Sequence, residues 1–188
     1  HLYGAHGLLP DHTNAKVRHT PVPRMHQGRW NKWLAFEIGN APFDTLYYED
    51  DDPTPRKVQG YQTDGLFDIA MNHLEHGRSD DKPFMCVLSV EPPHFPLKAP
   101  KELEDKWVGR ELKFKPSFLK PPDYDVPQDL YQLQDRETVI RNQQIYYAMI
   151  ENLDQNVGRM NAFLQRTGLW DNTIVMLVAD HGQMDGCH

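Results

Sequence analysis

The 188-residue sequence predicts an α/β fold in which helices flank a mostly parallel sheet, of which this chain supplies an incomplete part. Residues 84–90 and 173–179 form two almost continuously apolar runs, which are typical of strands covered on both faces. A segment with apolar residues at helical spacing precedes each run. The order helix, strand, loop, helix, strand therefore indicates a parallel sheet.

The first half of the chain is expected to contain one helix and one strand. Residues 1–60 are expected to be mostly loop, because they hold five of the ten histidines and many turn formers but little apolar periodicity. Residues 61–90 are expected to form a helix and then the first strand. Apolar residues recur at helical spacing from Thr63, and Gly77 stands where a C-terminal cap is expected.

The second half repeats this order after a long irregular segment. Residues 91–135 are expected to be a proline-rich loop region, since eight of the fifteen prolines fall between positions 91 and 130. Residues 136–188 are expected to form a helix of about five to six turns that ends at Gly168, then the second strand and a loop. The sequence starts at His1 and stops soon after the second strand, so we expect an internal part of one larger domain.

Composition limits the class of protein. Hydrophobic residues make up 39% and charged residues 25% of the chain, which is ordinary for a globular domain. No apolar run approaches the ~18 residues of a membrane-spanning helix. The formal charge of −7 has the wrong sign for binding a nucleic-acid backbone. Two cysteines, Cys86 and Cys187, are too few for a disulfide scaffold and leave the compartment open.

Histidine follows both predicted strands. Ligand sites in open α/β sheets lie beyond the carboxyl ends of the strands. After the first strand, prolines on both sides stiffen the loop that carries His94. After the second, Asp180 and His181 stand side by side before Gly182. A carboxylate and an imidazole are usable ligands for a hard or borderline divalent cation, although the remaining ligands must come from elsewhere.

Each of these three residues also has a purely structural interpretation. Asp180 alone would be the cap of the following turn, and His181 alone would be a partly buried, hydrogen-bonded histidine. His94 alone would be a packing residue. Because all three fall at the same predicted edge of one sheet, a shared functional site is favoured.

Three blocks of the sequence, in order, resemble the sulfatase family of the alkaline phosphatase superfamily. The blocks are Lys82-Pro83-Phe84 with Pro93-His94-Phe95-Pro96, the segment from Tyr147 to Arg159, and Gly168 to Val175 followed by Asp180-His181-Gly182. His1-Leu2 and the aromatic segment 28–36 resemble two further motifs of that family. The resemblance implies an alkaline phosphatase-like fold, with residues 1–188 forming part of a sulfatase catalytic domain.

The resemblance implies a metal-dependent sulfuric ester hydrolase, which cleaves sulfate monoesters with a formylglycine. The family makes this residue from Cys or Ser in a Cys/Ser-x-Pro/Ala-x-Arg motif, which does not occur in these 188 residues. The family's upstream pair of aspartates and the lysine after Asp-His-Gly are also not found here. We therefore expect the formylglycine in a segment outside this sequence, and we expect this chain alone to be inactive.

The resemblance also gives roles to individual residues. Asp180 and His181 would be metal ligands, for Ca²⁺ or alternatively Mg²⁺. His94 would contact the sulfate ester, and His1 would hold the geminal hydroxyl of the nucleophile and help to release sulfate. His188, in Gly186-Cys187-His188, would lie next to these contacting residues without touching the substrate, or at the rim of the pocket. The substrate would be a small-molecule or glycan sulfate ester.

Two other functions share part of this pattern. A phosphonate monoester hydrolase or phosphodiesterase of the same superfamily would share Asp180 and His181, and the nucleophile segment would distinguish it from a sulfatase. A non-catalytic chain that keeps the fold to bind sulfated ligands would lack the nucleophile altogether. The particular ester, the oligomeric state and the compartment stay open.

Overall fold

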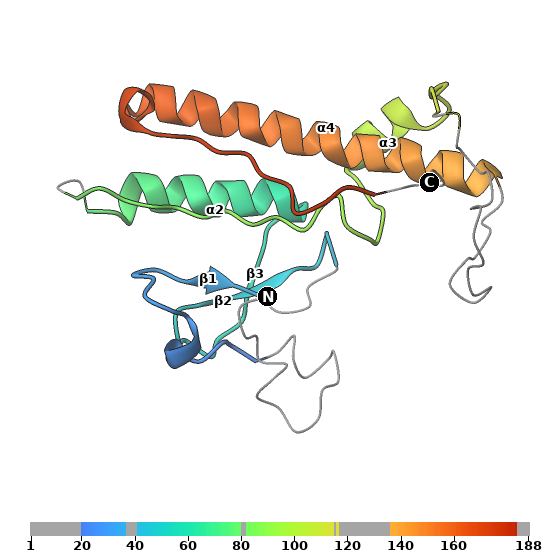
Figure 1. Ribbon diagram of the computed structural model, residues 1–188. Helices are drawn as coiled ribbons and strands as arrows, with labels where there is room; N and C mark the ends of the chain where they lie inside the picture. The colour runs from blue at the N-terminus through green and yellow to red at the C-terminus, as the bar shows by residue number, and fades with distance from the viewer. Residues whose placement is uncertain (1–19, 37–40, 80–81, 115, 117–135, 184–188) are drawn as a thin grey trace. The chain divides into compact units, whose positions relative to one another are not determined.

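The computed structural model describes residues 20–36, 41–79, 82–114, 116 and 136–183 (Figure 1). The chain divides into two compact units, His1–Pro96 and Leu97–His188. Within the described ranges, no helix combines the length and the apolar character that are needed to cross a membrane.

The first unit contains a three-stranded antiparallel sheet in the order β1-β2-β3. Its elements are the short 3-10 helix η2 (Arg24–His26) and the strands β1 (Leu34–Ala35), β2 (Leu46–Glu49) and β3 (Arg56–Lys57). Leu34 pairs with Glu49, and Leu46 pairs with Lys57. Strands this short carry too little alternation of apolar and polar residues to be predicted from the sequence.

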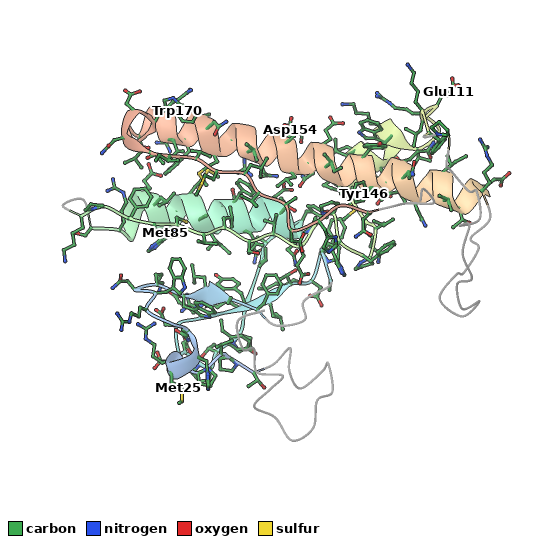
Figure 2. The ribbon with its side chains drawn as sticks, in the orientation of Figure 1. Met25, Met85, Glu111, Tyr146, Asp154 and Trp170 are labelled. Atoms are coloured by element: carbon green, nitrogen blue, oxygen red, sulfur yellow. The ribbon has the colours of Figure 1, made fainter. Side chains whose placement is uncertain are left out.

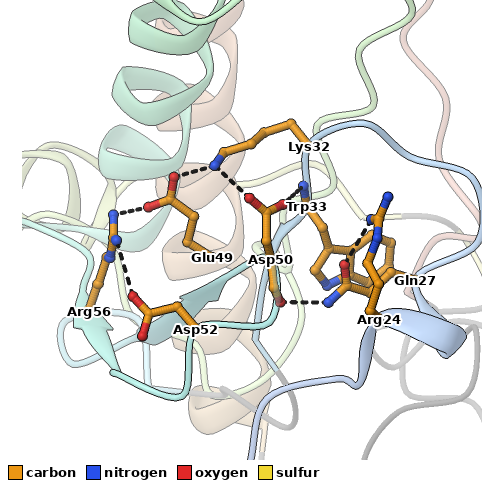
Figure 3. A network of polar contacts seen from close by, with 8 residues as sticks. All are labelled: Arg24, Gln27, Lys32, Trp33, Glu49, Asp50, Asp52 and Arg56. Atoms are coloured by element: carbon orange, nitrogen blue, oxygen red, sulfur yellow. Dashed lines mark hydrogen bonds and ion pairs between the residues drawn. The ribbon is translucent and has the colours of Figure 1, made fainter.

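A polar network ties β2 and β3 to the segment that precedes β1 (Figure 3). Lys32 forms ion pairs with Glu49 and with Asp50, whose Oδ2 lies 2.8 Å from Lys32 Nζ. Glu49 also pairs with Arg56. Burial alone would raise the pKa of Asp50, but hydrogen bonds from Lys32 and from the Trp33 amide, together with the Lys32 charge, lower it. The network therefore favours the ionised form of Asp50.

Helix α2 (Gln62–His76) confirms the first predicted helix. The helix ends at the predicted cap, where the amide of Gly77 donates to His73 O at 2.8 Å. Gly65 lets the helix approach the preceding chain closely, because a Cβ at this position would lie 2.4 Å from Val58 Cγ1. The buried residues of the helix are Gln62, Thr63, Gly65, Phe67, Ala70 and Leu74.

Helix α4 (Arg136–Arg166) is the long element of the second unit and confirms the second predicted helix, although its 31 residues make it longer than the predicted five to six turns. The helix ends at Arg166, two residues before the predicted glycine. Gly168 has a φ of 71°, and the amide of Leu169 then donates to Leu164 O at 2.9 Å. The other elements of this unit are α3 (Lys101–Trp107) and the short 3-10 helix η3 (Trp170–Asn172). Helix α3 lies within residues 91–135, which the sequence predicts to be loop, and it forms there because no proline occurs between Pro100 and Pro116.

The contact between α3 and α4 encloses the apolar cluster of the second unit. The cluster comprises Ala99, Leu103, Ile145, Ala148 and Met149. Burial of a side chain of the size of Met149 contributes about 1.5–3 kcal/mol to stability. At the end of α3, Trp107 stacks on Tyr147 with ring centroids 5.3 Å apart, and its Nε1 donates to Glu151 Oε2 at 2.6 Å. Apolar and polar contacts together fix α3 on α4.

The two apolar runs predicted as buried strands are not strands in the structure. Within the described ranges, no strand pairs with residues 84–90 or 173–179, and most of their apolar side chains are exposed. Met85, labelled in Figure 2, is 73% exposed and Leu177 is 74% exposed. The predicted parallel sheet is therefore not confirmed, and the sheet observed is antiparallel. The physical reason is that a strand requires a hydrogen-bonded neighbour, which neither run has among the residues that the structure describes.

Candidate functional site

The loop after the first apolar run presents the imidazole of His94 to solvent. The amide of His94 donates to Glu91 O at 2.9 Å and closes a turn through Pro92 and Pro93. Nδ1 of His94 donates to Phe95 O at 2.7 Å, since a carbonyl oxygen can only accept a hydrogen bond. This contact holds the ring against its own loop.

Glu91 connects this loop to the start of α2. The Glu91 side chain is half-buried, and this burial raises its pKa. The charge of His94 and a hydrogen bond from the Gln62 side chain act in the opposite direction. Gln62 is 1% exposed, and its Nε2 also donates to Thr45 Oγ1 at 2.8 Å. A series of polar contacts therefore runs from the buried Thr45 to the histidine loop.

Asp180 and His181 lie on the loop after the second apolar run. Their side chains are 89% and 67% exposed, respectively. Asp180 Oδ1 accepts a hydrogen bond from the His181 amide at 2.8 Å, and His181 Nδ1 donates to Gly182 O at 2.9 Å. In the neutral ring, this second contact places the lone pair on Nε2, which is the arrangement of a metal-ligating histidine.

The donor atoms of this pair fit a shared cation. Ligand atoms at about 2.0–2.6 Å from one metal ion stand roughly 3–3.6 Å from each other. Asp180 Oδ2 lies 3.6 Å from His181 Nε2, at the upper end of this range. In the described part of the chain, no group of three or more His, Cys, Asp or Glu side chains could hold a metal ion. Asp180 and His181 can therefore supply two ligands of a larger coordination sphere.

The predicted site residues fall in different parts of the chain. His1 and His188 lie outside the described residues. His94 belongs to the first unit, whereas Asp180 and His181 belong to the second, and each unit is described by itself. The convergence of Asp180 and His94 on one anion therefore stays a prediction.

Glu91 and Gln62 are the residues of this region that the sequence pattern did not single out. The available signal for Glu91 was a carboxylate three residues before a histidine in a loop stiffened by prolines. Gln62 gave no signal, because a polar residue in the first turn of a helix is ordinary. Its burial and its contact with Glu91 depend on how α2 packs within the first unit.

Comparisons with known proteins point to one family. The family model described as Sulfatase matches residues 26–186. The chain is 28% identical to the ulvan-active sulfatase of Formosa agariphila over 178 residues, which cover 94% of this chain and 32% of that protein. It is 30% identical to the arylsulfatase of Clostridium perfringens over 120 residues, which cover 59% of this chain and 24% of that protein. The chain thus spans about a third or less of the length of these curated relatives.

The fold is also similar to that of a solved protein. The yidJ protein of Bacteroides fragilis, named as a candidate sulfatase, superposes with a TM-score of 0.73. The match covers 88% of this chain and 35% of that chain, at 22% sequence identity. At this identity the likeness shows a shared fold alone.

Proposed function

Because the chain belongs to the sulfatase family, we propose that it is part of the catalytic domain of an enzyme that hydrolyses sulfate monoesters with a divalent metal. The observation that best supports this proposal is that two exposed histidines make the same kind of hydrogen bond. In both His94 and His181, Nδ1 donates to a neighbouring backbone carbonyl, at 2.7 and 2.9 Å. The Nε2 atoms of both rings are therefore the ones suited to a substrate or a metal.

His94 is proposed to donate a hydrogen bond to the sulfate ester. The Nε2–H of an imidazolium can donate to an ester or leaving-group oxygen, and the bond strengthens as negative charge develops there. A chain with a net charge of −7 needs such local positive charge to bind an anionic ester. His1 is proposed to hold the nucleophile's geminal hydroxyl. His188 is proposed to lie next to these residues or at the rim of the pocket, without contacting the substrate directly.

Asp180 and His181 are proposed to hold the metal, through the carboxylate and Nε2. A bound Ca²⁺, or alternatively Mg²⁺, would polarise a sulfuryl oxygen and orient the nucleophile. Asp180 would compensate the charge of the cation, and the hydrogen bond from the His181 amide holds its carboxylate beside the ring. The nucleophile itself is proposed to be a formylglycine outside these residues, since no Cys/Ser-x-Pro/Ala-x-Arg motif occurs among them.

The exposed apolar runs support a larger sheet. Side chains such as Met85 and Ile174, which are 73% and 89% exposed, would be costly to leave in water. We propose that residues 84–90 and 173–179 are strands of a parallel sheet whose other strands lie outside this chain. In such a sheet, His94 and Asp180 would follow the carboxyl ends of their strands, where ligands bind.

A turnover assay tests the proposed reaction. We expect the 188-residue chain to hydrolyse no aryl sulfate in the presence of Ca²⁺, because the absence of a covalent nucleophile removes the reaction path. We use the term extended polypeptide for a longer protein that contains residues 1–188 together with a segment that carries the formylglycine and the remaining metal ligands. This protein should hydrolyse aryl sulfate well above a heat-killed control. A chelator should abolish this activity.

The assay also distinguishes the other functions. A preference of the extended polypeptide for an aryl phosphodiester would instead indicate a phosphonate monoester hydrolase or phosphodiesterase. Binding of aryl sulfate without turnover would indicate a non-catalytic protein. Metal-dependent turnover by the 188-residue chain itself would contradict the assignment of the nucleophile to another segment.

A further inference from the structure

We propose that Arg110, stacked on Trp107 just after α3, binds a sulfate group of a sulfated carbohydrate beside the exposed ring of Tyr147. This inference rests on the proposed function, which makes sulfate esters the substrates, and it names a glycan with more than one sulfate group. Arg110 would hold a sulfate group other than the one that is hydrolysed. The supporting features lie where α3 packs on α4 (Figure 1): a fixed guanidinium, an aromatic pair and the local charges.

The guanidinium of Arg110 is held by its own part of the chain. Its Nε donates to Lys106 O at 2.8 Å, and its Cζ lies 4.9 Å from the centroid of the Trp107 ring. The backbone is fixed as well, because the Arg110 amide donates to Trp107 O at 3.1 Å and Nε2 of the buried Gln144 donates to Arg110 O at 2.8 Å. Arg110 is nevertheless exposed, and among the described residues its terminal nitrogens have no hydrogen-bond partner. A guanidinium that is already oriented loses less conformational freedom when it binds an anion.

The aromatic pair beside Arg110 suits a sugar. Trp107 stacks on Tyr147 with an angle of 24° between the ring planes, and Glu151 holds the indole through the hydrogen bond from Nε1. Tyr147 is 40% exposed. An exposed tyrosine offers an apolar ring to the C–H groups of a sugar and a hydroxyl to its polar groups. An anion carried on a sugar can therefore use both Arg110 and Tyr147, whereas a free sulfate ion can use only the arginine.

The charges around Arg110 leave it able to attract an anion. Glu151 is engaged with Lys106, and the hydrogen bond from Lys106 is the largest cause that lowers the pKa of the Glu151 carboxyl. The charge of Arg110 adds a smaller contribution in the same direction. Glu111 follows Arg110 in the chain and is exposed, so water and salt screen its charge. The planar guanidinium fork matches two oxygens of one sulfate group, which gives the contact its selectivity.

A titration of the 188-residue chain tests this inference, because no turnover of the probe is expected in this chain. The probe is a dextran oligosaccharide that is sulfated at several positions, and calorimetry gives its Kd. We expect Arg110→Gln to raise this Kd roughly fivefold, the effect of losing an exposed charge-assisted contact. Arg110→Lys, which keeps the charge but not the fork, should recover only part of the affinity. Unmodified dextran of the same length should bind much more weakly than the sulfated form.

The matched control is a second arginine that lies over an aromatic ring in the same unit. Arg166, whose Cζ lies 5.3 Å from the centroid of the Phe163 ring, is the last residue of α4. Because it is 22 residues beyond Gln144 on the same helix, roughly 33 Å along its axis, Arg166→Gln removes the same charge at a distant position. The Kd of Arg166→Gln should equal that of wild type. In ¹⁵N NMR, the indole N–H signal of Trp107 should shift on addition of the sulfated probe and should shift less in Arg110→Gln.

The outcomes separate this inference from the proposed function. An unchanged Kd in Arg110→Gln, an equal loss of affinity in Arg166→Gln, or equal binding of sulfated and unmodified dextran would each overturn the role of Arg110. In the extended polypeptide, Arg110→Gln should leave turnover of an aryl sulfate unchanged, since this substrate carries a single sulfate group. If the wild-type extended polypeptide hydrolyses no aryl sulfate, the proposed function fails, and the titration still decides whether Arg110 binds a sulfated carbohydrate.

Discussion

We expect the Asp180→Ala variant of the extended polypeptide to lose its divalent metal, with metal content after dialysis roughly tenfold or more below wild type. The substitution removes both a ligand oxygen and a negative charge that compensates the cation. It also removes the acceptor for the His181 amide, which lies 2.8 Å from Asp180 Oδ1. Metal analysis of the purified proteins measures this directly.

Two further variants make the result specific. Asp180→Asn keeps an acceptor oxygen for the His181 amide, so a loss of metal in this variant reports the charge and not a rearranged loop. Asp171→Ala changes an exposed carboxylate on η3 in the same unit and should retain wild-type metal content. A fully loaded Asp180→Ala protein would show that Asp180 is not a ligand.

For His94→Ala, we expect kcat/KM for an alkyl sulfate to fall roughly 100-fold or more, which is the usual effect of removing a positioned acid or charged donor. An alkyl alcohol is a poor leaving group, so negative charge develops strongly on the ester oxygen that Nε2 would contact. Metal content should stay at the wild-type level, because His94 is not assigned to the metal. Steady-state kinetics with parallel metal analysis measures both quantities.

The matched control for His94 is a second exposed histidine of the same unit. His76 is the last residue of α2, its side chain is 69% exposed, and its Nε2 lies 3.9 Å from Glu75 Oε2. Because His76 is not assigned to the site, His76→Ala should leave kcat/KM unchanged. His94→Gln, which supplies a neutral donor in place of a charged one, should fall between His94→Ala and wild type. Equal activity of His94→Ala and wild type would remove His94 from the site.

The helices could be predicted from the sequence because their signals are local. The glycines at 77 and 168 located the C-terminal ends of α2 and α4, whereas the periodic apolar residues did not show that α4 begins as early as Arg136. The strands could not be predicted in the same way. The apolar runs at 84–90 and 173–179 have the composition of buried strands. Their pairing, however, depends on a neighbouring strand that the local sequence does not specify.

In the candidate site, contacts between sequence neighbours could also be predicted, whereas contacts between distant residues could not. Asp180 and His181 are adjacent in sequence, so their proximity was available from the sequence. The contact between Glu91 and Gln62 was not, because it joins a loop to a helix start far away in the chain. The ion pairs of Lys32 with Glu49 and Asp50 could not be predicted from the sequence either, since they depend on how the loop before β1 folds back on the sheet.

A crystal structure of the extended polypeptide with metal and sulfate bound tests the shared site most directly. A metal–oxygen bond of about 2.3 Å, an anion about 2.5 Å across and a hydrogen bond of about 2.9 Å place the functional atoms of Asp180 and His94 roughly 8 Å apart. We predict a separation of no more than about 10 Å, with both side chains directed at the same anion. A separation well beyond that limit, or either side chain pointing into the apolar core, would contradict a single sulfate ester site formed by these residues.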